Sequence, residues 1–163
     1  MNSTATAFSA QRSANGIAVF WAGLTCGVMD ITAALVVYGL VYGVPPLQLL
    51  QGIASGLLGR QAYRGGIATA ALGLLLHFVI AFSAAAVYFL VSRKFPFLIQ
   101  EAVVSGVLYG VAVYFFMQQV VALSATVKRP FSVQLLLIGM VIHIFCVGLP
   151  IALLVRRYSV IKA

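Results

Sequence analysis

Four long apolar stretches, separated by short polar breaks, constrain this chain more than any other feature of its sequence. They cover residues 17–44, 67–91, 97–124 and 131–155. A helix needs about 20 mostly apolar residues to cross the hydrocarbon layer of a bilayer, and each stretch is long enough. Backbone polar groups inside a bilayer must be satisfied within their own segment, so each stretch is expected to be helical. The sequence therefore predicts an all-α polytopic membrane protein, with four transmembrane helices in one membrane domain over residues 1–163.

The composition points to the same class of protein. Hydrophobic residues make up 63% of the 163 residues and charged residues only 7%. A soluble domain is about 45–50% apolar and about 25% charged. Ten basic and two acidic side chains cannot cover a water-facing surface of this size. Intrinsic disorder is excluded as well, because it requires low hydrophobicity.

Two segments lie outside the apolar stretches and have their own character. Residues 1–15 are rich in Ser, Thr and Ala and carry one charge, Arg12, so we expect a mobile tail. The apolar run that follows is too long for the ~7–15-residue core of a cleaved signal peptide, so it is expected to be retained. Residues 47–59 are too short to span a bilayer. Their polar and glycine positions share one helical side: Gln48, Gln51, Ser55 and Gly59. This pattern favours a short interfacial helix between the first two spans, with a re-entrant segment as the alternative.

The net charge is +8, and all ten basic residues lie outside the apolar cores. There they are expected to meet the headgroups of anionic lipids. No basic patch is interleaved with aromatic residues, so we expect no nucleic-acid partner. Six basic residues fall on the side of the two chain ends: Arg12, Arg93, Lys94, Arg156, Arg157 and Lys162. Four fall on the opposite side: Arg60, Arg64, Lys128 and Arg129. The excess favours cytoplasmic termini.

The sequence also repeats a signature. The first and third stretches contain an acid followed by Tyr-Gly: Asp30-x7-Tyr38-Gly39 and Glu101-x7-Tyr109-Gly110. The second and fourth contain a glycine four residues before a histidine: Gly73-x3-His77 and Gly139-x3-His143. Two matched pairs in the same order predict a parallel duplication of a two-helix hairpin.

The two acids and two histidines of the chain all lie in predicted membrane segments: Asp30, His77, Glu101 and His143. An ionisable group at that depth costs several kcal/mol, so it normally faces a bundle interior, a partner or a water-filled path. In an antiparallel four-helix bundle the acids and the histidines would form the two diagonals. All four are therefore predicted to converge on one volume as an ion- or proton-binding cluster. Histidine changes its charge near neutral pH, which makes proton exchange feasible.

Structural roles remain open for the same residues. The histidines would serve equally well as hydrogen-bond partners between helices, and Asp30 as a contact to one of them. Glu101 would fit at headgroup level, near Arg93 and Lys94. The two cysteines, Cys26 and Cys146, lie inside apolar stretches, so a disulfide framework is not expected.

Glycines mark candidate packing faces. Opposite the two acids lie the pairs Gly39/Gly43 and Gly106/Gly110, whose GxxxG spacing suits close contact with another helix or with a second subunit. Gly73 and Gly139 precede the two histidines and are further packing candidates. A homodimer is therefore a possible partner state, beside the lipid bilayer itself.

No enzyme motif is present: the chain has no CxxC, HExxH, Walker loop or dinucleotide fingerprint, so we expect no catalytic activity. Three hypotheses remain. The first is a transport protein that handles ions or protons through the acid–histidine cluster. The second is a structural or accessory subunit of a larger membrane complex. The third is a b-type haem held by His77 and His143, with Gly73 and Gly139 clearing space for the porphyrin.

Several of these residues also support a resemblance to a family. They lie from Ala22 to Asp30, from Leu72 to Tyr88, from Ser105 to Gly110, and at His143. In this pattern the chain resembles small uncharacterised four-helix inner-membrane proteins of bacteria, of the YagU-like kind. Residues 45–66 do not align with that pattern. The resemblance implies a bacterial inner membrane, and it carries over no catalytic role.

Overall fold

The computed structural model describes residues 3–123 and 132–160 of the chain, and every regular element in them is helical. The first two spans and the segment between them are α1 (Ser3–Tyr42), α2 (Pro46–Leu58), the 3-10 helix η1 (Gly59–Arg64) and α3 (Gly66–Ser92). The remainder consists of α4 (Phe97–Gln100), α5 (Ala102–Leu123), α6 (Val133–Ile142), the π-helix η2 (His143–Gly148) and α7 (Leu149–Val160).

Four helical segments are long and apolar enough to cross a membrane. They are Asn15–Tyr42, Gly66–Ser92, Ala102–Val120 and Val133–Ser159, the last of which joins α6, η2 and α7. The predicted all-helical chain with four such segments is therefore confirmed. The predicted end at residue 124 and start at residue 131 lie outside the described residues.

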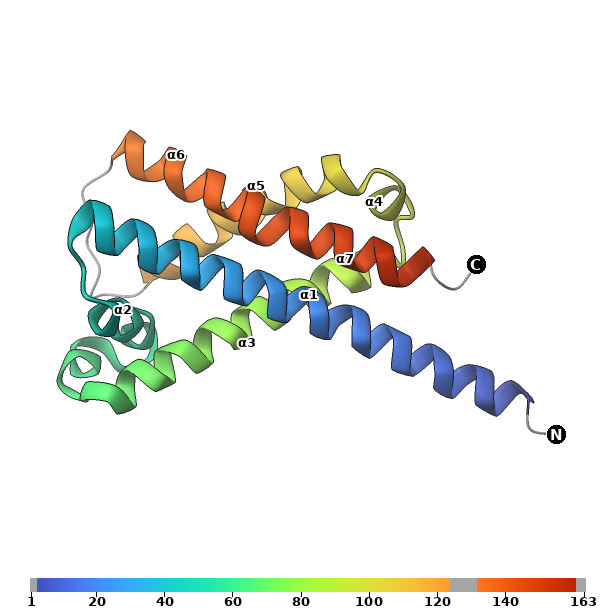
Figure 1. The fold of residues 1–163 in the computed structure, drawn as a ribbon, viewed down its shortest axis with the longest axis horizontal. Helices are drawn as coiled ribbons and strands as arrows, with labels where there is room; N and C mark the ends of the chain where they lie inside the picture. Colours follow the sequence, from blue (N-terminus) through green and yellow to red (C-terminus); the bar gives the residue numbers. More distant parts are fainter. Residues whose placement is uncertain (1–2, 124–131, 161–163) are drawn as a thin grey trace.

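The spans form an antiparallel bundle in which α1 is central (Figure 1). It packs against α3 on one side and against η2 and α7 on the other, while α5 packs against η2 and α7. The rings of Tyr88 and Tyr109 join α3 to α5, with centroids 4.9 Å apart. The first and third spans are thus diagonal to each other, as the bundle argument predicts.

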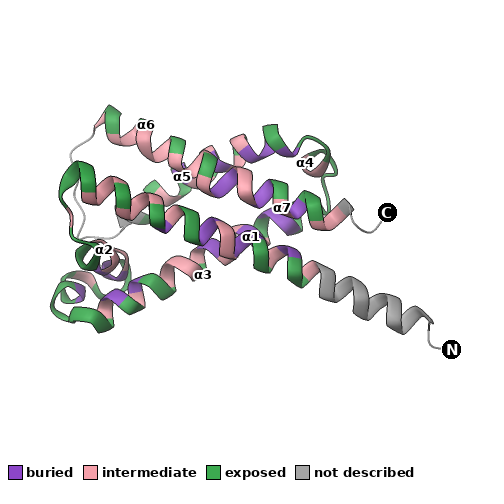
Figure 2. Ribbon diagram, viewed as in Figure 1, coloured by how far each residue is buried: buried purple, intermediate pink, exposed green. Residues whose placement is uncertain are grey.

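The two halves of this bundle differ. We call the half with both chain ends and α4 the α4 half, and the half with α2, η1 and α6 the α2 half (Figure 1). The main buried cluster lies in the α4 half, near the middle of the view in Figure 2. It comprises Ala18, Ala22, Cys26, Ala81, Ala85, Tyr88, Phe89, Ala102, Val147, Ile151, Ala152 and Val155. Small residues in it let the helices approach closely.

Helix α2 lies across the end of the bundle, where Figure 1 shows it nearly end-on. Its polar side faces inward: Gln51 and Ser55 are buried, and the Gln51 amide donates to the Gly66 carbonyl at 3.0 Å. Its exposed positions carry mostly apolar side chains, Leu47 and Leu57 among them, although Gln48 is exposed as well. This is the reverse of a helix on the surface of a soluble protein, which buries its apolar side.

Three helix boundaries depart from the sequence prediction. α1 begins at Ser3, inside the segment 1–15 that we expected to be a tail. The third span, expected to be continuous from residue 97, breaks at Glu101, whose φ is −103° and ψ 52°. The fourth changes from α to π geometry at His143. Both of the last two departures lie close to a proline, Pro96 or Pro150, which has no backbone N–H to continue the helical hydrogen-bond pattern.

Candidate functional site

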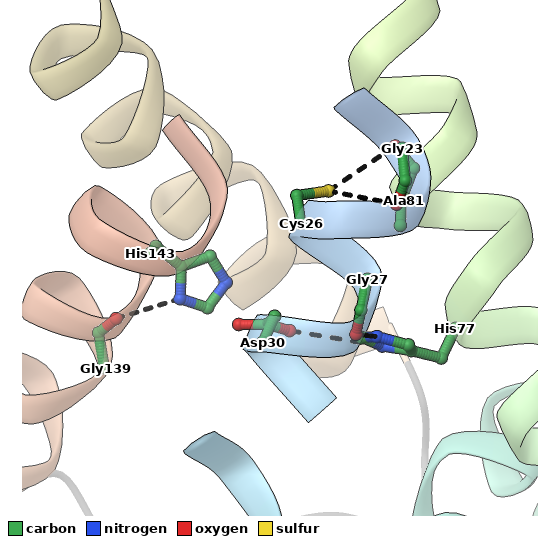
Figure 3. Close-up of polar contacts among 8 residues, drawn as sticks. All are labelled: Gly23, Cys26, Gly27, Asp30, His77, Ala81, Gly139 and His143. Carbon is green, nitrogen blue, oxygen red and sulfur yellow. Dashed lines mark hydrogen bonds and ion pairs between the residues drawn. The ribbon is translucent and has the colours of Figure 1, made fainter. Parts of the chain in front are cut away.

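Asp30 on α1 and His77 on α3 form an acid–histidine pair between two adjacent spans (Figure 3). Nδ1 of His77 lies 4.0 Å from Oδ2 of Asp30. The His77 side chain is 12% exposed and that of Asp30 20%, so neither is sealed from its surroundings. Both are ionisable groups inside membrane-spanning segments, where a charged acid costs about 2.5–3.5 kcal/mol on insertion scales. Their pairing is the arrangement expected for groups kept at that depth.

The second nitrogen of His77 fixes the protonation pattern of this pair. Nε2 lies 2.9 Å from the Gly27 carbonyl oxygen, which can only accept a hydrogen bond. Nε2 therefore carries a hydrogen, and Nδ1 of a neutral ring turns its lone pair toward Asp30. Nδ1 of His77 and Oδ2 of Asp30 therefore face each other as two acceptors. At 4.0 Å the atoms are too far apart for a direct hydrogen bond, but one water molecule would bridge them.

Glycines on α1 bring the two spans close enough for this contact. A Cβ atom on Gly27 would lie 2.7 Å from the Phe78 ring, and one on Gly23 would overlap the Phe82 ring. The absence of both side chains admits the aromatic rings of α3 against α1. That close approach places the Gly27 carbonyl within reach of His77.

His143 lies on the other side of Asp30 from His77, at the first residue of η2 (Figure 3). Its Nδ1 donates to the Gly139 carbonyl on its own helix at 2.8 Å, and its ring packs edge-on against Tyr114. Nε2 is then the free acceptor of the neutral ring. Because α1 contacts both α3 and η2, Asp30 lies between helices that each carry a histidine. Local π geometry of this kind often marks functional sites.

Glu101 is not brought to this centre. It is exposed at the break between α4 and α5, and the neighbouring Gln100 carbonyl accepts from Arg156 at 3.2 Å. Arg156 lies thirteen residues beyond His143, which is about 20 Å along a helix. Of the four ionisable residues predicted to converge, three gather in the middle of the bundle. Glu101 lies at its end, as the headgroup-level alternative describes.

The two cysteines lie one helical turn from the centre. Cys26 lies four residues before Asp30 on α1, and Cys146 lies three residues after His143. Sγ of Cys26 approaches the carbonyl oxygens of Gly23 and Ala81 at 3.6 and 3.9 Å (Figure 3). Both thiols are free.

A second polar cluster lies in the α4 half, and the sequence analysis missed it. The Tyr88 hydroxyl donates to the Leu98 carbonyl at 2.8 Å and lies 2.8 Å from Oγ of Ser105. Ser105 also reaches the Glu101 carbonyl at 2.9 Å, and the Tyr109 hydroxyl donates to the Ala84 carbonyl at 2.7 Å. We call Tyr88, Ser105 and Tyr109 the hydroxyl cluster. Tyr88 and Ser105 both reach the Leu98 carbonyl, which precedes the helix break at Glu101, while the Glu101 carbonyl keeps a helical partner in the Ser105 N–H. Pro96, just before the break, was the available signal.

The candidate packing glycines divide into two groups. Gly106 and Gly110 lie against the fourth span: a Cβ on Gly110 would be 2.7 Å from the His143 oxygen. Gly73 meets the Leu50 backbone of α2, and Gly139 meets the Tyr114 ring.

Among the residues that the structure describes, a Cβ atom on Gly39 or Gly43 would come within 4 Å of no atom of another helix. The atom nearest to a Cβ built on Gly39 would be the backbone oxygen of Val44, at 3.9 Å. Gly43, with φ +62°, donates its N–H to the Gly39 carbonyl and ends α1. Its left-handed conformation is one that glycine adopts without strain.

The positions of these side chains bear on the metal and haem hypotheses. No group of three His, Cys, Asp or Glu side chains within residues 3–123 and 132–160 is arranged to hold a metal ion. A porphyrin between His77 and His143 would have to displace Asp30, and ligation through Nε2 of His77 would break its bond to Gly27.

Comparison of the chain with family models, curated proteins and solved structures gives no match. The resemblance to YagU-like proteins therefore stays a prediction.

Proposed function

We propose that this chain is a small membrane transport protein that handles protons, or a cation exchanged for them, at the Asp30–His77 pair. One observation carries the proposal: in the middle of two adjacent spans, a carboxylate and an imidazole acceptor face each other across 4.0 Å. A purely structural pair of spans needs no titratable contact, and ionisable residues inside membrane helices usually mark ion or proton pathways.

The pair has two protonation states with different net charge. With one proton bound, on Oδ2 of Asp30 or Nδ1 of His77, the pair is neutral. When the proton leaves, one negative charge remains in the span, where it attracts a new proton or a cation. Transfer between the two residues moves one proton from a carboxyl oxygen to an imidazole nitrogen and leaves every other bond unchanged. His143, across Asp30, offers a second acceptor for the same proton.

Proton flux in proteoliposomes tests the proposal. The unaltered chain is expected to dissipate an imposed pH gradient, reported by an entrapped pH-sensitive dye. Asp30→Asn keeps the size of the side chain and removes its titratable group, so flux should fall to that of protein-free vesicles. Glu101→Gln is the matched control, because Glu101 lies away from the pair, and it should leave flux unchanged. Flux unaffected by Asp30→Asn would refute the proposal.

The proposal includes a placement in the membrane. We propose that both termini lie in the cytoplasm, supported by the excess of basic residues on the side of the chain ends. The bacterial inner membrane is proposed from the resemblance to YagU-like proteins alone. α2 is proposed to lie in the opposite interface, because Leu47 and Leu57 face outward and Arg60 and Arg64 follow directly. The repeated acid and histidine signature supports a duplicated hairpin.

A structural or accessory role is the second candidate, and a specific observation favours it. Only 17–28% of the most apolar window of each span is buried within the chain, and α6 has no buried residue. Much apolar surface therefore remains for lipid, for a second copy or for a larger complex. A partner in fixed stoichiometry after extraction in mild detergent, together with absence of flux, would support this role.

A further inference from the structure

We infer that the end of the bundle in the α4 half carries a binding surface for the headgroup of an anionic phospholipid. The surface consists of the exposed segment 93–97 and of two exposed arginines near the end of α7, Arg156 and Arg157. We call it the headgroup surface. The inference concerns a bound lipid and not a transported ion, so it does not rest on the proposed function.

The headgroup surface joins basic side chains from two segments that are distant in the sequence. Arg93 and Lys94 directly follow α3, and Arg156 and Arg157 lie in the last turns of α7. Helix α7 packs against both α3 and α4, and Figure 1 shows the connection from α3 to α4 beside the end of α7. Four positive charges are therefore gathered at one end of the bundle.

The protein itself does not neutralise these charges. Glu101 is the acid nearest to them in the sequence. Among the residues that the structure describes, however, the one acid–base pair within 4.0 Å joins Asp30 to His77 in the middle of the bundle. The four basic side chains thus have no carboxylate against them. Positive charge at the end of a membrane span attracts anions, and the anions at a membrane surface are the phosphates of lipids.

Arg156 is held in place by the backbone of α4. Nη1 of its guanidinium group donates to the Gln100 carbonyl at 3.2 Å, just before the helix break. A guanidinium group carries five N–H donors in a planar fork, so the others remain to bind a phosphate through parallel hydrogen bonds. Because the bond to α4 orders the side chain in advance, less conformational entropy is lost when a lipid binds.

The hydroxyl cluster fixes α4 from inside the bundle. The Tyr88 hydroxyl and Oγ of Ser105 both reach the Leu98 carbonyl, at 2.8 and 2.9 Å. The Leu98 side chain packs against the main buried cluster. The exposed segment 93–97 is therefore attached at one end to α3 and at the other to an anchored α4.

Two exposed aromatic rings favour a lipid over a free anion. Phe95 is 61% exposed and Phe97 52%, and both follow Lys94 within three residues. At the boundary between headgroups and acyl chains such rings are buried among the chains, and basic groups beside them lie at the level of the phosphates. The surface thus fits a lipid with a net negative headgroup, such as phosphatidylglycerol. Phosphatidylcholine fits less well, because its ammonium group cancels the phosphate charge.

Native mass spectrometry of the protein released from detergent micelles tests the inference. Phosphatidylglycerol or phosphatidylcholine with the same acyl chains is titrated in, and the dissociation constant of the first bound lipid is measured. We expect phosphatidylglycerol to bind at least about tenfold more tightly, since each basic group near an anionic headgroup contributes about fivefold. Lys94→Gln with Arg156→Gln should remove most of this preference.

The opposite end of the bundle offers a matched control. Arg60→Gln with Arg64→Gln also removes two exposed charges, but these follow α2. This control should leave the binding of the first phosphatidylglycerol unchanged. Equal losses in the two double variants would refute the site, because they would reveal an effect of net charge alone. Equal affinity of the unaltered chain for the two lipids would refute it as well. Thermal melting of each variant shows whether it remains folded.

A third double variant separates a lipid from free phosphate. Phe95→Ser with Phe97→Ser keeps every charge and should weaken the binding of phosphatidylglycerol about fivefold or more, because apolar surface is withdrawn from the acyl chains. Unchanged binding in this variant, together with displacement of the lipid by inorganic phosphate, would replace the lipid site with a phosphate site. Lipid binding requires no proton flux, so failure of either proposal leaves the other standing.

Discussion

The two helical hairpins of this protein carry the same sequence signature but use it differently. In the first, Asp30 lies beside His77 at 4.0 Å. In the second, Glu101 is exposed at a helix break, and His143 bonds to its own helix through Gly139. The signature thus predicts the position of an acid and a histidine on neighbouring helices, and not their contact.

The glycines of the two hairpins also differ, but here the close contact is in the second hairpin. In the second hairpin, Gly110 lies directly against the backbone of His143 and Ile144, whereas a Cβ on its counterpart Gly39 would meet no other helix among the described residues. The second hairpin is therefore joined tightly through its backbone and has little room for an acid between its helices. We infer a division of roles, in which the first hairpin supplies the titratable pair and the second a rigid support.

The largest expected difference is in proton flux, between substitutions of His77 and of His143. His77→Gln removes the ring nitrogen that faces Asp30, and proton flux should fall by about 100-fold or more, within the 10²–10⁴ range typical of a lost proton-transfer group. His143→Gln should reduce flux only about twofold to threefold, because its Nδ1 is already bonded to Gly139. Flux assays at matched protein density measure both. Equal losses would abolish the proposed division of roles.

The next largest difference is expected in stability, between substitutions of Gly110 and of its counterpart Gly39. Gly110→Ala would place a methyl group 2.7 Å from the His143 oxygen and the Ile144 Cα, so the spans must separate. We expect a loss of about 2–3 kcal/mol in the free energy of unfolding. Gly39→Ala meets only an ordinary contact and should be neutral, or stabilising by up to about 1 kcal/mol. Reversible denaturation in detergent measures both, and a destabilising Gly39→Ala would reveal a helix contact absent from this structure.

A smaller contrast is expected at the glycines before the histidines. Gly73→Ala would overlap the Leu50 backbone and should cost about 2 kcal/mol by displacing α2. Gly139→Ala meets the edge of the Tyr114 ring, which can rotate away, and should cost about 1 kcal/mol. Protease cleavage between α2 and α3 should accelerate only in Gly73→Ala. Acceleration in both variants would show that α2 responds to general loosening.

The smallest effect concerns α2, the element inserted between the spans of the first hairpin. Gln51→Ala removes the hydrogen bond from the side-chain amide to the Gly66 carbonyl, and this loss should cost about 1 kcal/mol of stability. Gln48→Ala, at an exposed position on the same helix, should change stability by less than about 0.5 kcal/mol. Thermal melts of the two variants provide the comparison. Equal melting temperatures would show that the Gln51 contact contributes nothing to holding α2.

The sequence predicts the spans well because their signal is local. Apolar length and flanking prolines or basic residues place α3 within one residue of the predicted 67–91. The helix break at Glu101 was missed although Pro96 precedes it, and local sequence does not show the contact that accompanies it, in which Tyr88 from another span binds the Leu98 carbonyl. The same reason applies to the site: residue type and depth identified Asp30 and His77, while the displacement of Glu101 depends on how α4 and α7 pack.

The most direct test of the central claim is ¹⁵N solid-state NMR of the histidines of the protein in lipid bilayers. The pair predicts that Nε2 of His77 stays protonated, and that the Nδ1 resonance of His77 changes with pH and with Asp30→Asn. The resonances of His143 should be unaffected by Glu101→Gln. A His77 Nδ1 resonance that ignores Asp30→Asn at every pH would contradict the claim that these two residues share a proton.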